Sequence, residues 1–243
     1  CIRDRSYNDE KYLDFGLELL KKIITSCFDT EYFPKSRNIR QLVFYLKYFI
    51  ILREFLKESS NEIPGYLDEI IFHLGKGYNF VWGSVKQSLL FNGNHNSNLE
   101  DFDVYLDYQK YSFKSEKRDL GGYGILKNKH VILGMDIGSP PESKFSENYQ
   151  SGPLSFEAIY KGTKIICNSG YYQNIKNKLN LISRSTAAHS TLILNNNSIV
   201  TFKRNFKGKI YNKLNFNTSK KNIVCEKNYW LIKISHEGYL KNY

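Results

Sequence analysis

The sequence is poor in cysteine and has no long apolar run, and each shortage excludes a class of protein. The four cysteines are Cys1, Cys27, Cys167 and Cys225. They lie far apart and form no Cys-x-x-Cys pair, which argues against a zinc knuckle or a redox motif and predicts free thiols. The longest apolar run, residues 42–52, is interrupted by Lys47 and is far shorter than the ~20 residues that a membrane span requires. We therefore expect no transmembrane segment.

Motifs of several catalytic and binding classes are absent as well. The sequence has no phosphate-binding glycine loop, no nucleophile elbow, no RNA-binding aromatic signature and no internal repeat of fixed period. His73, His95 and His130 have no partner residue at the spacing of a metal site or a catalytic triad. We predict no cofactor, and the sequence defines no oligomeric state.

The charge balance is the first feature that points to a function. The net charge is +11, from 35 Lys and Arg against 24 Asp and Glu, and a basic surface attracts acidic ligands. Abundant Asn, Lys, Ile and Tyr also fit the codon bias of an AT-rich genome. Against that alternative, residues 201–243 hold ten Lys or Arg and only Glu226 and Glu237 as acids. Nucleic-acid binding is not predicted, because the aromatic residues lie mostly at core-like spacing rather than interleaved with basic ones.

The apolar pattern changes from helical to strand-like along the chain. In residues 9–107 apolar residues recur at helical spacing, with a second helix at about 39–57 and a third from Pro64 to about residue 74. After about residue 117, strands are predicted at 123–126, 130–136, 154–160, 163–168, 189–194, 199–206, 209–216, 223–226 and 229–235. Their spacing favours an antiparallel sandwich over βαβ units. We therefore predict an α+β fold with helical hairpins in residues 1–110 and an antiparallel β-sandwich in residues 118–243.

Six segments follow one another in an order that resembles a known family. They are Leu-Phe-Asn-Gly at 90–93, Gly-Tyr at 122–123 leading into Asp-Ile-Gly-Ser-Pro-Pro at 136–141, Leu-Ser-Phe-Glu at 154–157, Cys-Asn-Ser-Gly at 167–170, the run 184–191, and Ser-His-Glu-Gly-Tyr at 235–239. Together they resemble the heparinase II/III-like polysaccharide lyases, bacterial enzymes that cut acidic glycans. The resemblance implies that residues 1–110 are the last helices of an α/α toroid. It also implies that the sandwich is incomplete at its C-terminal end, and that the protein lies in the periplasm or cell envelope.

The ends of the sequence suggest that it is a fragment. It begins at Cys1 instead of methionine and ends at Tyr243 within a strand-rich region, so we expect any secretion signal to lie upstream. Alternatively, Cys1 is the lipid-bearing first residue of a processed lipoprotein.

The resemblance also implies a chemistry, with several of its positions substituted. A lyase of this family removes the proton beside a uronate carboxylate and expels the glycosidic oxygen, which requires a base, an acid and a group that neutralises the carboxylate. Asn148 stands where the relatives have a catalytic histidine, while Gln150 and Asn168 stand at two of their zinc ligands. Only the third ligand, His189, is retained. We therefore predict no structural zinc and expect His189 to hydrogen-bond Asn168 and Gln150 instead.

The candidate site residues come from both halves of the chain. The candidate catalytic residues are His189, Arg184 and Tyr149, and the candidate substrate-binding residues are Arg37, Asn92, Gln150 and Asn168. Arg184 and His189 lie five apart at the predicted entrance of the strand at 189–194. The Arg184 guanidinium suits a carboxylate or sulfate, but it also suits a structural salt bridge or a loop carbonyl.

Two functions of different classes remain open from the sequence. The leading hypothesis is a lyase that acts by β-elimination on an acidic, uronate-containing glycan. The alternative is a non-catalytic glycan-binding or envelope-structural protein on the same scaffold. They differ in whether Tyr45, Tyr48 or Tyr149 converges with Arg184 and His189 on one cleft.

Overall fold

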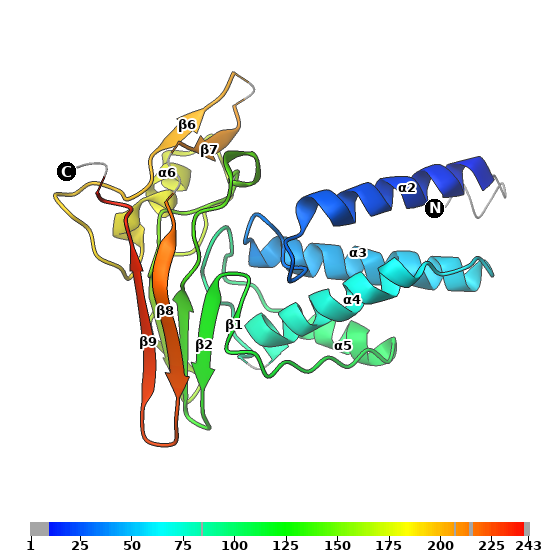
Figure 1. Cartoon of the computed structure of the whole chain (residues 1–243), viewed down its shortest axis with the longest axis horizontal. Coiled ribbons are helices and arrows are strands. Elements are labelled where there is room, and N and C mark those ends of the chain that lie inside the picture. Colours follow the sequence, from blue (N-terminus) through cyan, green and yellow to red (C-terminus); the bar gives the residue numbers. More distant parts are fainter. Residues whose placement is uncertain (1–9, 84, 207, 214–215, 241–243) are drawn as a thin grey trace.

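The computed structural model describes residues 10–83, 85–206, 208–213 and 216–240. Cys1, and with it the question of a lipid anchor, lies outside the described residues. Helices fill one side of the molecule and strands the other (Figure 1). The chain is thus an α+β protein, as predicted.

The helical part precedes the strands in the sequence. It contains α2 (Glu10–Cys27), α3 (Ile39–Glu58), α4 (Gly65–Tyr78), the π-helical turn η1 (Asn79–Gly83) and α5 (Glu100–Tyr108). The Asn38 side chain caps α3 by accepting hydrogen bonds from the backbone N–H groups of Arg40 and Gln41. Pro64 immediately precedes α4, where it costs no helical hydrogen bond.

One apolar core joins the helices to the first sheet. Leu46 of α3 and Leu74 of α4 are fully buried in the same cluster as Tyr123 and Ile159 of the sheet. Burial of such side chains is the main contribution that holds the helices and the first sheet together. The outer side of α2, in contrast, leaves Phe15 62% exposed.

The first sheet has five antiparallel strands in sequence order. They are β1 (Asp119–Leu120), β2 (Tyr123–Lys127), β3 (Val131–Asp136), β4 (Phe156–Tyr160) and β5 (Thr163–Ile166). Asn128 closes the β2–β3 turn by accepting hydrogen bonds from the backbone of His130 and Val131. The strands predicted from residue 123 to residue 168 are confirmed in their order and approximate position.

The chain between β5 and residue 200 differs from the prediction. The structure has α6 (Lys178–Arg184) and the 3-10 turn η3 (Thr186–Ala188), and no strand covers 189–194, so that prediction was wrong. A side chain competes with strand pairing here, because the backbone N–H and hydroxyl of Ser190 both hydrogen-bond the Asn168 side chain. Asn177 caps α6 through the backbone N–H of Leu179.

Two further hairpins complete the strand part. They are β6 (Phe202–Arg204) with β7 (Ile210–Asn212), and β8 (Thr218–Cys225) with β9 (Trp230–His236); the 3-10 turn η2 (Ser143–Phe145) lies before them. A Cβ on Gly124 of β2 would lie 3.5 Å from Ile232 of β9, so the β8–β9 hairpin packs on the first sheet. Figure 1 shows this hairpin on the side away from the helices.

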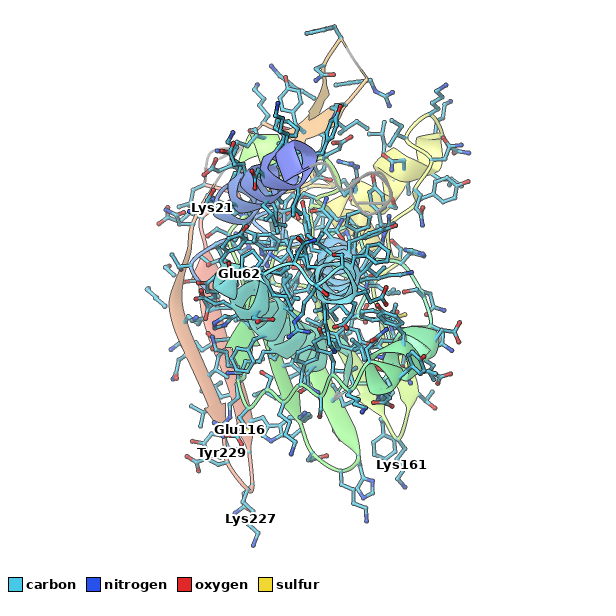
Figure 2. The ribbon with its side chains drawn as sticks, turned by 90° about the vertical axis from the view of Figure 1, so that its right-hand side faces the viewer. Lys21, Glu62, Glu116, Lys161, Lys227 and Tyr229 are labelled. Carbon is cyan, nitrogen blue, oxygen red and sulfur yellow. The ribbon has the colours of Figure 1, made fainter. Side chains whose placement is uncertain are left out.

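The basic residues of the strand part lie mostly on exposed hairpins. Figure 2 shows Lys227 at the tip of β8–β9 and Lys161 at the β4–β5 turn, both pointing outward. Of the basic residues at the end of the sequence, Lys227 thus projects from a hairpin tip, while Lys209 and Lys221 pair with Glu147 and Asp119. In the described part of the chain, no helix is long and apolar enough to span a membrane. Cys27, Cys167 and Cys225 are free thiols there.

Candidate functional site

A four-residue loop, Asn92 to His95, lies between η1 and α5 and contacts the strand part through Gln150 and Tyr171; we call it the seam loop. Asn92 and Gly93 both have positive φ, at 41° and 81°. A Cβ on Gly93 would collide with the Asn38 side chain and lie 2.9 Å from Cβ of Asn148. Only glycine therefore allows the helix start and the strand part to approach this closely. Each residue of the loop then contacts a different group of side chains.

Asn92 belongs to a buried polar network around an ion pair. Its Nδ2 donates to Oδ2 of Asp136 and to the Tyr123 hydroxyl, both at 2.9 Å. Asp136 also pairs with Arg37, whose Nη1 donates to the Ser139 carbonyl at 3.0 Å. Burial opposes the charge of Arg37, but Asp136 raises its pKa above the ordinary value. The structure thus brings Arg37 and Asn92 together, with their polar groups bonded to the protein.

Gln150 ties the seam loop to the strand part. Its Oε1 accepts from the Gly93 N–H at 3.0 Å, and its Nε2 donates to the carbonyls of Ser183 at 2.6 Å and Gly170 at 3.1 Å. The side chain is fully buried. Both the oxygen and the nitrogen of the Gln150 amide are therefore hydrogen-bonded within the protein.

Arg184 is the largest fully buried side chain in the described residues. It donates to the Glu147 carbonyl and, at 3.1 Å, to the Tyr171 hydroxyl, and its guanidinium lies over the rings of Tyr171 and Phe202 at 5.4 and 5.1 Å. Its Nε and Nη1 have no hydrogen-bond partner in the described structure. Burial lowers its pKa, and the opposing effects of Tyr171 and of the Glu147 carboxylate, which pairs with Lys209 instead, do not offset this. Of the alternatives for Arg184, the structure shows the bond to a loop carbonyl.

His189 is also buried, and it does not make the expected hydrogen bonds. Neither ring nitrogen has a partner among the described residues, and Cγ of the ring would lie 2.8 Å from a Cβ on Gly152. The predicted bonds to Asn168 and Gln150 are wrong, because Gln150 bonds backbone groups and Asn168 accepts from Ser190. Burial lowers the pKa of His189 to about 4, despite the nearby Ser183 carbonyl.

The residues at the zinc positions of the family do not fit a zinc ion. Asn168 and Gln150 are neutral amides whose oxygens already accept from N–H groups, and His189 offers one imidazole. Zinc prefers thiolate, imidazole and carboxylate ligands. The described residues contain no group of three or more His, Cys, Asp or Glu that could hold a metal.

In the described structure, none of the three tyrosines considered for catalysis hydrogen-bonds Arg184 or His189. Tyr149 is buried in a small apolar cluster with Ile199 and Val200, and burial raises its pKa. Tyr45 packs edge-on against Phe28 in the helical core, at 4.9 Å between ring centroids. Tyr48 is 52% exposed on α3.

A carboxylate that the sequence did not single out holds the strand side of the seam. Glu157 of β4 is fully buried, and its Oε1 accepts from the backbone N–H groups of Leu90 and Asn168 at 3.2 and 3.0 Å. Its other oxygen pairs with Lys164 at 3.0 Å. The Leu-Ser-Phe-Glu segment is thus explained by a charge that fixes β5 and the approach to the seam loop.

A second group missed from the sequence lies at the accessible side of the seam. Nη1 of Arg40, in the first turn of α3, lies 3.3 Å from Nδ1 of His95. The side-chain amide of Gln173, from the strand part, lies 3.3 Å from Nε2 of the same ring. Arg40 and His95 are half-buried and Gln173 is exposed. Burial and then Arg40 lower the pKa of His95.

Asn148 packs against Gly93 of the seam loop, two positions before His95, and a relay of hydrogen bonds orients its amide. Arg184 can only donate, so the Tyr171 hydroxyl accepts from it and gives its own hydrogen to Oδ1 of Asn148, at 3.0 Å. The amide nitrogen of Asn148 is therefore the end left for another partner. Tyr171 is anchored to the seam loop through its backbone N–H, which donates to the Asn94 carbonyl at 2.8 Å.

A pocket of about 410 Å³ opens directly after the seam loop. Asn96, Ser97 and Asn98 line it together with Trp82 and Glu100 on the helical side and Lys164 on the strand side. Such a mixture of amide, hydroxyl, ammonium, carboxylate and indole groups suits a sugar ring with its hydroxyl groups. The seam thus combines donors for an acid, a titratable imidazole and a polar hollow.

The fold and the seam together define a class of α+β protein in which helices pack on an antiparallel sheet and both contribute polar groups to one junction. Residues 113–243 match the family described as Heparinase II/III-like, C-terminal. This is more than half of the chain, and the chain belongs to this family.

Solved structures show the same fold. The heparan sulfate lyase HepC from Pedobacter heparinus is 14% identical and has a TM-score of 0.69, over 95% of this chain and 38% of that chain. Heparinase III is 14% identical with a TM-score of 0.68, over 96% of this chain and 40% of that chain. The chain therefore spans less than half the length of these structures. No protein of curated function matches the chain in sequence.

Proposed function

We propose that this chain is part of a polysaccharide lyase that acts by β-elimination on an acidic, uronate-containing glycan. The observation that carries the proposal is the contact of Arg40, from the helices, with His95 of the seam loop, where Asn148 of the strand part packs against Gly93 of the same loop. Arg40 and the Asn148 amide nitrogen are hydrogen-bond donors that suit a carboxylate, and His95 is a titratable group beside Arg40. Family membership and the fold of the heparan sulfate lyase support the assignment.

The proposal includes an architecture and a location. Residues 1–110 are the last helices of an α/α toroid, residues 118–243 are an antiparallel β-sandwich, and the glycan lies between them with one sugar in the pocket beside Trp82. The protein acts in the periplasm or cell envelope. The location is supported only by the family resemblance.

A second candidate function is glycan binding without cleavage. Asn148 favours it, because an amide at the position of the relatives' catalytic histidine cannot take up a proton. The buried state of His189, Arg184 and Tyr149 favours it too.

The experiment combines product formation with binding on a panel of acidic glycans. A lyase yields unsaturated uronate, which is followed by its ultraviolet absorbance, and binding is followed by calorimetry. We expect Arg40→Gln and Asn148→Ala to weaken both, whereas Lys47→Gln, which removes an exposed charge from the same helix, leaves both unchanged. Binding without product would favour the second candidate, and the absence of both would exclude an acidic glycan as the ligand.

A further inference from the structure

We propose that Arg40 is shared between His95 and the acidic group of the glycan, so that glycan binding frees Nδ1 of His95 to take up a proton. The inference rests on the proposed function and names the group that performs its proton transfer. The sequence did not suggest a role for His95, because it has no partner residue there at the spacing of a metal site or a catalytic triad.

The contact between Arg40 and His95 fixes the state of the imidazole. A guanidinium has only N–H groups, so at 3.3 Å it donates to Nδ1, which must therefore be the acceptor. A neutral imidazole has one hydrogen, which then lies on Nε2. The amide nitrogen of Gln173 can only donate, and it lies 3.4 Å from Nδ1 and 3.3 Å from Nε2, so with this tautomer it too faces Nδ1 as a donor. The lone pair that could act as a base is thus covered by a cation.

Arg40 has donor capacity left for a second partner. Across the described parts of the chain, neither Arg40 nor His95 forms an ion pair with a carboxylate, and the groups that face the ring are Arg40 and the neutral Gln173. A carboxylate or sulfate can therefore bind the guanidinium in bidentate fashion without displacing an acid of the protein. Asn148 packs against Gly93 of the same loop, and its amide nitrogen is a further donor of the seam.

Glycan binding then changes His95 in two ways. Once the guanidinium turns to the uronate, Nδ1 loses its charged donor and keeps only the exposed Gln173 amide beside it, and the positive charge that suppressed protonation is neutralised. Nδ1 can take the proton from the carbon beside the carboxylate. The C–H electron pair forms the carbon–carbon double bond, the bond to the glycosidic oxygen breaks, and that oxygen receives the proton back from the imidazolium. No oxidant or co-reactant is required.

The test follows the His95 ring by nitrogen-15 NMR in the whole chain, with His95→Gln to identify its signals. We expect Arg40→Gln to raise the pKa of His95, and a saturating uronate oligosaccharide to raise it in the wild type but no further in Arg40→Gln. Lys47→Gln is the control and leaves the signal unchanged. In turnover, His95→Gln loses about 10²-fold or more, and Arg40→Gln moves the acid limb of the pH profile to higher pH.

The outcomes separate the two proposals. An oligosaccharide that binds while the His95 signal stays constant, or a His95→Gln variant with full turnover, overturns the inference and leaves the proposed function standing. If no acidic oligosaccharide binds the wild type, the proposed function fails and the inference fails with it. In either case, the pKa of His95 in Arg40→Gln, compared with that in the wild type, measures the effect of the Arg40–His95 contact on the imidazole.

Discussion

Acidification should destabilise this protein through one buried imidazole. His189 is 9% exposed, and its pKa is about 4 in the folded chain against an ordinary 6.5. Between these values the unfolded chain binds a proton that the folded chain does not, so stability is full above pH 6.5 and is lost as the pH falls to about 4. A difference of about 2.5 units at about 1.4 kcal/mol each gives a loss of roughly 3 kcal/mol.

The assay is urea denaturation of the wild type and of His189→Leu, near neutral pH and at about pH 4. Other titrating groups contribute to both proteins, so the difference between their losses isolates His189. We expect the variant to lose about 3 kcal/mol less than the wild type between the two conditions. His130→Leu, on an exposed turn, is the matched control. Equal losses in His189→Leu and the wild type would refute the argument from burial.

Three further predictions concern the seam. Asp136→Asn breaks a buried ion pair and should cost about 3–5 kcal/mol in the same denaturation assay, against about 1 kcal/mol or less for Asp68→Asn at a surface pair. Gly93→Ala should cost about 1–3 kcal/mol and lower the melting temperature, whereas Gly208→Ala, where a Cβ meets no neighbour, should cost less; equal effects would contradict the close approach at the seam. Gln150→Leu leaves one N–H and two carbonyls without partners and should cost about 1–3 kcal/mol, with earlier amide hydrogen exchange at the seam loop as the diagnostic signal.

Periodicity was enough to predict α2, α3 and α4 and the strands β2 to β5, because these elements bury one regular face each. It failed at residues 189–194, where the run Thr-Leu-Ile-Leu at 191–194 is apolar and partly β-branched, as in a short strand. There the Asn168 side chain, more than twenty positions earlier, takes the backbone N–H and hydroxyl of Ser190. A competitor so distant in the chain leaves no trace in a local pattern.

The family segments predicted the location of the seam better than the roles of its residues. Asp136 and Glu157, each inside one of those segments, are buried carboxylates that hold the two parts together. The burial of Arg184 between two rings is a tertiary property that its residue type does not suggest. His95 was missed because its partner Arg40 lies 55 positions away, on a helix.

The outer side of α2 has a practical consequence for work with this chain. Phe15, Leu19 and Tyr12 are 62%, 47% and 46% exposed, and they recur at spacings that place them along one stripe of the helix. An apolar stripe in water promotes self-association, which high concentrations of sulfate or phosphate strengthen and dilution reverses. Melting and titration curves should therefore be recorded over a dilution series. Without it, steep curves caused by aggregation through this stripe would be taken for cooperative unfolding or binding.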